Sequence, residues 1–206
     1  MDIVRIAAAL GLLAALVDPA LAHHVMDGRT PTTFMEGLLS GLGHPIIGYD
    51  HLAAVIAVGC LAATQPYGAL CAITFVLAML AGVAIHGIAF TIPGLELVVA
   101  FTVIGLGALL AWPRTFGGGL IITLFWLAGL VHGLALGQSV VGAQPHPLGG
   151  YFAGLAIVQS AIALGAMFAA RRLFAGQQAL SPVRLVGAGI AGLGLAIMLQ
   201  QLMLGA

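Results

Sequence analysis

Apolar segments about as long as a bilayer is thick follow one another along nearly the whole chain, separated by short breaks that contain Gly or Pro. An α-helix needs about 20 apolar residues to cross the hydrocarbon core of a membrane. Of the 206 residues, 62% are hydrophobic and only 6% are charged, whereas a soluble domain carries about 25% charged residues. Because so few polar groups could not cover a water-exposed surface, we predict that lipid surrounds most of the chain.

The breaks predict an all-α, polytopic membrane helix bundle with about six transmembrane helices. We expect these helices over residues 34–63, 68–91, 95–113, 117–140, 147–173 and 182–204. The first is too long for one straight crossing, so we expect the stretch Gly41-Leu42-Gly43-His44-Pro45 to break it into two pieces. The 30 glycines indicate helices that pack closely through small residues.

The amino terminus has the pattern of a secretory signal peptide. Asp2 and Arg5 precede an apolar run over residues 6–17, and Ala20-Leu21-Ala22 follows it. We predict a signal peptide over residues 1–22 and one transmembrane domain over 23–206, with an uncleaved anchor as the alternative. The mature amino terminus, His23, would then lie on the periplasmic side of a bacterial inner membrane.

The arginines agree with this orientation. If residue 23 is periplasmic, the loops after the first, third and fifth helices are cytoplasmic. These loops and the helix ends beside them contain Arg114, Arg171, Arg172 and Arg184, and Arg29 alone lies outside. The distribution follows the positive-inside rule. No basic patch with stacking aromatic residues is present, so the sequence does not indicate nucleic-acid binding.

Ionisable residues inside the first predicted helix are the strongest functional signal, because such residues are costly in a membrane. They are His44, Asp50 and His51. On one continuous helix, residues seven apart differ by about 20° around the axis, so we expect His44 and His51 to share a face. The alternative is an Asp50–His51 pair that only ties two helices together.

His86 and His132 lie late in the second and fourth predicted helices, each followed by glycine. Both helices run outward, so both histidines are expected in the outer half of the membrane. Each could be a ligand or a packing histidine. Secondary metal candidates are His23, His24, Glu96 and His146, and we interpret Gln159 as an interhelical hydrogen-bonding residue and Met79 as a core residue.

Several imidazoles with one carboxylate suit a borderline divalent metal ion such as nickel, cobalt or zinc. Magnesium and calcium prefer oxygen ligands, and monovalent copper prefers sulfur. No nucleotide-binding motif is present. We therefore predict a secondary permease for a divalent transition-metal ion, with no permanent cofactor and no enzyme activity.

The string His44-Pro45-Ile46-Ile47-Gly48-Tyr49-Asp50-His51-Leu52 resembles the HupE/UreJ family, and the likeness covers essentially the whole mature chain. Ile92-Pro93-Gly94-Leu95-Glu96 also resembles the start of that family's third helix. The resemblance implies a nickel or cobalt permease, or an accessory protein of hydrogenase or urease. Zinc and copper are secondary candidates from ligand chemistry alone. The resemblance assigns metal handling to His44, Asp50 and His51.

One departure from the family pattern concerns the segment after His132. Leu136 and Ser139 stand where the resemblance implies a second histidine and a glutamate. Two candidate ligands are therefore missing. Either His86 or His146 compensates, or the protein moves a different ion or none.

Two other functions remain open. One is a non-transporting accessory protein that delivers metal to a metalloenzyme complex or assembles it. The other is an intramembrane metalloenzyme. Such an enzyme needs a base beside its metal, and the sequence disfavours it because Asp50 is the one candidate acid predicted to lie deep in the membrane. The expected partners are the lipid bilayer, a divalent metal ion and a metalloenzyme maturation system, and the sequence is compatible with a homo-oligomer.

Overall fold

A computed structural model of the chain describes residues 29–86, 92–173 and 180–204, and every regular element in these ranges is helical. The predicted signal peptide, His23 and His24 lie outside the described residues. In order, the helices are α2 (Phe34–Ile47), α3 (Tyr49–Ala62), α4 (Gly68–His86), α5 (Leu95–Ala111), α6 (Gly118–Gly137), α7 (Pro145–Leu173) and α8 (Leu180–Leu204), with the short 3-10 turn η2 (Gln138–Val140) after α6. The all-α prediction is confirmed.

Each of the six predicted membrane segments has a helical counterpart. Four are long and apolar enough to cross a membrane: α4, α6 with η2, α7 and α8. Helices α2 and α3 together pass the same test as one broken span, while α5, with 17 residues, is shorter. Helix α5 ends at Ala111, before the predicted end at Pro113. The ring of a proline disfavours helical geometry at the residue before it, which here is Trp112. Trp112 is accordingly extended.

The break in the first segment lies at Gly48, later than predicted. Helix α2 continues through Pro45 to Ile47, and α3 leaves it at an angle of 78°. Gly41 does not interrupt α2. It allows close packing instead, because a Cβ there would collide with the backbone carbonyl of Tyr151 on α7. Pro45 lies in the last turn of α2, where few further helical hydrogen bonds depend on it.

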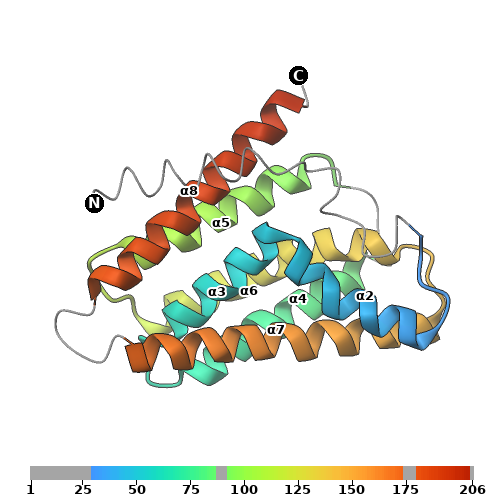
Figure 1. Ribbon diagram of the computed structural model, residues 1–206, viewed down its shortest axis with the longest axis horizontal. Coiled ribbons are helices and arrows are strands. Elements are labelled where there is room, and N and C mark those ends of the chain that lie inside the picture. The colour runs from blue at the N-terminus through green and yellow to red at the C-terminus, as the bar shows by residue number, and fades with distance from the viewer. Residues whose placement is uncertain (1–28, 87–91, 174–179, 205–206) are drawn as a thin grey trace.

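Three closely packed pairs build the bundle (Figure 1): α2 with α7 and α4 with α6, which run in the same direction, and α5 with α8, which are antiparallel. Each pair is joined through glycine. Gly133 of α6 lies against the carbonyl of Met79 on α4, and Gly187 of α8 lies against the backbone of Gly107 on α5. Without a water-driven hydrophobic effect between helices in lipid, such close backbone contact is a main source of attraction.

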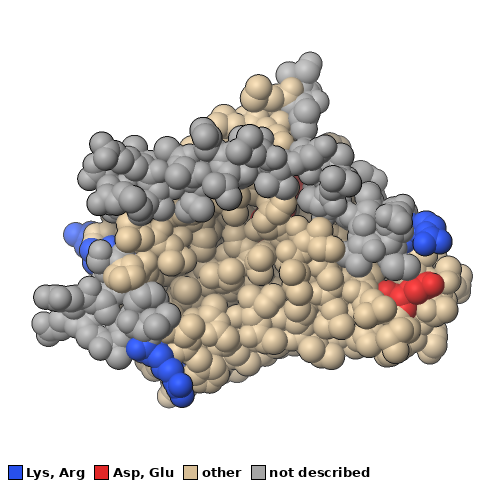
Figure 2. All heavy atoms as spheres, viewed as in Figure 1, with Lys and Arg blue, Asp and Glu red and all other residues tan. Residues whose placement is uncertain are grey.

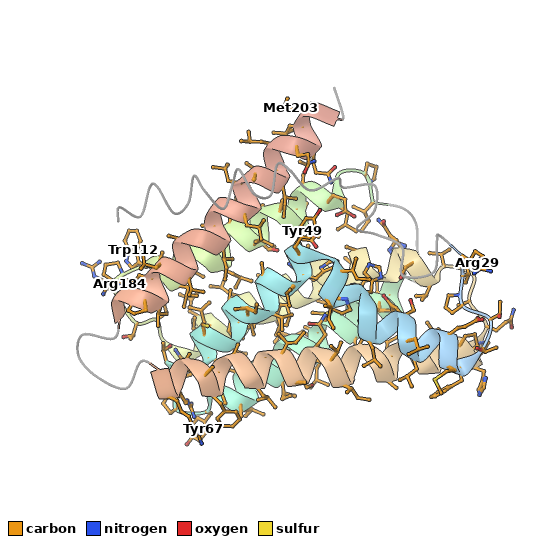
Figure 3. The ribbon with its side chains drawn as sticks, viewed as in Figure 1. Arg29, Tyr49, Tyr67, Trp112, Arg184 and Met203 are labelled. Carbon is orange, nitrogen blue, oxygen red and sulfur yellow. The ribbon has the colours of Figure 1, made fainter. Side chains whose placement is uncertain are left out.

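The blue arginine side chains in Figure 2 lie at the two ends of the molecule, and most of the described surface between them is uncharged. Arg29 and Arg184 mark opposite ends in Figure 3. Arg114 and Arg184 line one shallow pocket together with Thr64. Arg171 donates to the carbonyl of Gln65 at 2.9 Å, close to Thr64 in sequence. The arginines predicted to be cytoplasmic therefore gather at one end, which we call the arginine-rich end, and the sidedness stays a prediction.

Candidate functional site

The bend at Gly48 brings the ionisable residues of the first segment together. His44 lies in the last turn of α2, and Asp50 and His51 lie in the first turn of α3. All three side chains are buried, and the ring centroids of His44 and His51 are 6.1 Å apart. The two histidines are near each other, but the predicted reason was wrong, because they do not share the face of one continuous helix.

Asp50 is held at the start of α3. Its Oδ1 accepts the backbone N–H of His51 at 2.8 Å. A carboxylate is favoured at this position by the partial positive charge of a helix amino terminus. Gly48 leaves the space for both side chains, because a Cβ there would lie 3.2 Å from Asp50 Oδ1 and 3.1 Å from His51 Cδ2.

His51 makes a direct contact with His132 of α6. Their Nδ1 atoms are 2.7 Å apart, so one nitrogen must carry the proton and the other must accept it. On its other side, His132 Nε2 lies 2.9 Å from Oγ1 of Thr102, a residue of α5. Three separate helices therefore hold this pair of imidazoles.

The neighbours of Thr102 settle which nitrogen carries the proton. Its hydroxyl lies 2.7 Å from the carbonyl of Val99, which can only accept, so the single hydroxyl proton is donated there. Thr102 Oγ1 must then accept from His132 Nε2–H. Neutral His132 is consequently an acceptor at Nδ1, and His51 is the donor at its own Nδ1. In a neutral His51, this tautomer leaves Nε2 with a lone pair.

A second group of polar atoms lies on the His44 side. The fully buried Tyr151 of α7 donates its hydroxyl to the carbonyl of Leu136 at 2.9 Å and lies 3.4 Å from His44 Nδ1. Ser139 lies 2.8 Å from the same carbonyl and 3.1 Å from the Tyr151 hydroxyl. Ser139 thus remains beside the cluster as a hydroxyl, where the family resemblance implies an acid, while the Leu136 side chain is core.

The remaining candidates lie elsewhere. His86 ends α4, is buried against Gly137, and its Nδ1 has no hydrogen-bond partner among the described residues. His146 is exposed and lies beside Phe34, with ring centroids 5.4 Å apart. Glu96 is partly exposed in the first turn of α5. No contact recorded for the described residues joins any of these three to the His51–His132 pair.

Within the described ranges, no group of three or more His, Cys, Asp or Glu side chains is arranged to hold a metal ion. The four residues His44, Asp50, His51 and His132, which we call the histidine cluster, are gathered around the bend without forming such a group. The cluster therefore offers imidazole nitrogen and one carboxylate, in a loose arrangement.

Sequence reasoning missed Thr102 and Tyr151, which orient the histidines. A hydroxyl in the middle of the apolar third segment was the available signal for Thr102. For Tyr151 the signal was weaker, because tyrosine is common near helix ends in membranes. Neither residue type is a usual ligand for the metals considered.

The family model described as HupE / UreJ protein matches residues 10–197. The chain belongs to the HupE/UreJ family. Protein HupE of Rhizobium leguminosarum bv. viciae is 36% identical to it over 126 residues, which are 59% of this chain and 62% of that relative. The matched region thus spans less than two thirds of the relative's length. No solved structure matches the chain.

Proposed function

We propose that this HupE/UreJ protein is a secondary permease for a divalent transition-metal ion, nickel or cobalt, and that the histidine cluster binds the ion in transit. The observation that carries the proposal is the chain from Thr102 through His132 to His51. It leaves an unprotonated Nε2 on His51, and the buried carboxylate of Asp50 lies in the same first turn of α3. Neutral imidazole and carboxylate are ligands that these ions accept.

The geometry of the backbone also supports transport. Broken helices form the binding sites of many transporters, because irregular backbone is tolerated in a membrane only where it lines a site or is buried in protein. The 78° bend between α2 and α3 is such a break, and the candidate ligands flank it. A site with few ligands suits transport, since the ion must bind well enough to enter and weakly enough to leave.

His86 is retained as an additional ligand on the way to the cluster, because its buried Nδ1 has no described partner. A polar nitrogen left unsatisfied in this way costs about 1–3 kcal/mol, which a passing cation would recover. The exposed His146 has no comparable feature and serves as a control.

The proposal is tested by accumulation of ⁶³Ni and ⁵⁷Co in cells that express the wild type, His51→Ala, Asp50→Ala or His146→Ala at matched membrane levels. We expect the first two variants to fall to the background of cells without the protein. His146→Ala removes the same type of side chain outside the cluster and should retain wild-type uptake. Normal accumulation in both His51→Ala and Asp50→Ala would refute the proposal.

The second candidate function is a non-transporting accessory protein for metal delivery to, or assembly of, a metalloenzyme. It is favoured by the lack of a three-residue metal group in the described parts of the chain and by Leu136 and Ser139. In this case, the purified protein in liposomes would give no ⁶³Ni flux. Cells that lack the protein would still have an impaired nickel enzyme, and a stable partner would copurify with the protein in detergent.

A further inference from the structure

Gln159 occupies a core position of α7 that packing alone would give to an apolar residue. Every fourth residue along this helix forms one fully buried stripe, consisting of Tyr151, Leu155, Gln159, Ala163 and Met167. The Gln159 Nε2 donates to the thioether sulfur of Met79 on α4 at 3.1 Å. Its Oε1 has no hydrogen-bond partner among the described residues.

This arrangement is a poor way to tie two helices together. A thioether is a weak acceptor, and a buried carbonyl oxygen without a donor costs about 1–3 kcal/mol. Turning the amide over does not help, since Oε1 would then face a sulfur that has no proton to give. The expected interhelical hydrogen bond is present, but leucine or methionine would fill the position without the penalty.

The position of Gln159 relative to the histidine cluster follows from the register of α3 and α7. Gly59 packs against the backbone of Ala163, and Arg171 binds the carbonyl of Ala63. The two contacts pair α7 residues with Gly59 of α3 and with Ala63, which directly follows α3, at a similar offset in number, so the two helices run in the same direction. Gln159 therefore lies level with residues 51–55 along the helix axes, within about one helical turn of the level of His51.

Met79 approaches the cluster from the other side. Its backbone carbonyl lies against Gly133, the neighbour of His132. One turn earlier on α4, the ring of Phe75 contacts the ring of His132, with centroids 6.1 Å apart. The Gln159–Met79 pair therefore borders the His51–His132 pair from α4 and α7.

We propose that Gln159 Oε1 and Met79 Sδ form the next binding position of the divalent cation, between the His51–His132 pair and the arginine-rich end. This inference rests on the proposed permease function. An amide oxygen and a thioether are neutral, weak ligands for nickel or cobalt, so they favour release of an ion that the imidazoles have captured. The cation satisfies the oxygen for which the described residues provide no donor.

The experiment uses Gln159→Leu in the full chain, with three measurements: ⁶³Ni flux into liposomes under an imposed membrane potential and proton gradient, ⁶³Ni binding to detergent-purified protein, and thermal unfolding. We expect flux to fall at least about tenfold, with binding unchanged and Tm unchanged or raised. Met79→Leu should reduce flux in the same direction by a smaller factor, because it removes only the sulfur.

Gln65→Leu is the matched control. Gln65 is also buried, but its amide donates to the carbonyl of Phe116 at 3.2 Å, so this substitution should lower Tm and leave flux per folded protein unchanged. Wild-type flux in Gln159→Leu would overturn the inference and leave the permease intact. A joint loss of flux, binding and Tm would also overturn it, because the role would be structural. A wild type without flux or cellular uptake would overturn both proposals.

Discussion

Replacing Thr102 with valine should weaken cation binding by changing where one proton lies. Valine has nearly the shape of threonine but lacks Oγ1, which accepts from His132 Nε2–H. The variant leaves that N–H buried without an acceptor. The imidazole pair can avoid this by moving the protons: His132 then donates from Nδ1 to His51 Nδ1, and the proton of His51 moves to Nε2, the nitrogen that would bind the cation.

The size of the effect follows from the lost hydrogen bond. An unsatisfied buried donor costs about 1–3 kcal/mol, and 1.4 kcal/mol corresponds to a tenfold change in an equilibrium. The balance between the two proton arrangements should therefore shift by about 5- to 150-fold toward the one that protonates His51 Nε2. Because cation binding requires the other arrangement, KM for uptake should rise by up to this factor.

The assay is the concentration dependence of ⁶³Ni uptake at matched protein levels. Thr102→Ser is the control, since it retains a hydroxyl that can donate to Val99 and accept from His132. We expect Thr102→Val to raise KM and Thr102→Ser to leave KM near the wild-type value. An unchanged KM in Thr102→Val, or an equal rise in both variants, would refute the assignment of the tautomers.

Two glycines provide further predictions. Gly48→Ala introduces a Cβ 3.1 Å from His51 Cδ2, at a backbone geometry (φ −76°) that alanine adopts readily. KM for ⁶³Ni should therefore rise, while the free energy of unfolding should change by less than about 1.5 kcal/mol. An unchanged KM would show that the crowding is harmless. Gly133→Ala places a Cβ against the carbonyl of Met79, and should destabilise the protein by about 1–3 kcal/mol in thermal unfolding. Gly105→Ala is the control, because the added Cβ meets nothing within 4 Å, and it should unfold at or above the wild-type temperature. Equal Tm values for Gly133→Ala and Gly105→Ala would contradict the close α4–α6 contact.

The helices could be predicted from sequence because the membrane leaves few alternatives. Backbone polar groups in lipid must be satisfied within the segment, so a long apolar run becomes a helix. Boundaries followed where Pro or Gly ended the run, as at Ala111 before Trp112-Pro113. The position of the bend did not follow, because the sequence cannot show that Gly41 packs against α7 while Gly48 makes room for Asp50 and His51.

The candidate site was only partly predictable for a related reason. Depth along a helix can be counted from the sequence, but depth alone does not show which side chains meet. The direction around the helix axis depends on neighbours that the sequence does not name. His86 and His132 were given similar depths, yet His132 contacts His51, whereas His86 packs on Gly137 and has no recorded contact with the pair.

The bend explains why the motif spacing matters. On a straight helix, residues seven apart are about 10 Å apart along the axis, too far for two imidazoles to share one ion. The 78° turn at Gly48 brings the His44 and His51 rings to 6.1 Å, and the first turn of α3 adds the Asp50 carboxylate at a position where the helix favours its charge. A small further change in this angle would alter the distance between the two rings. The bend therefore sets how close the two candidate ligand rings come, at a distance that one straight helix would not allow.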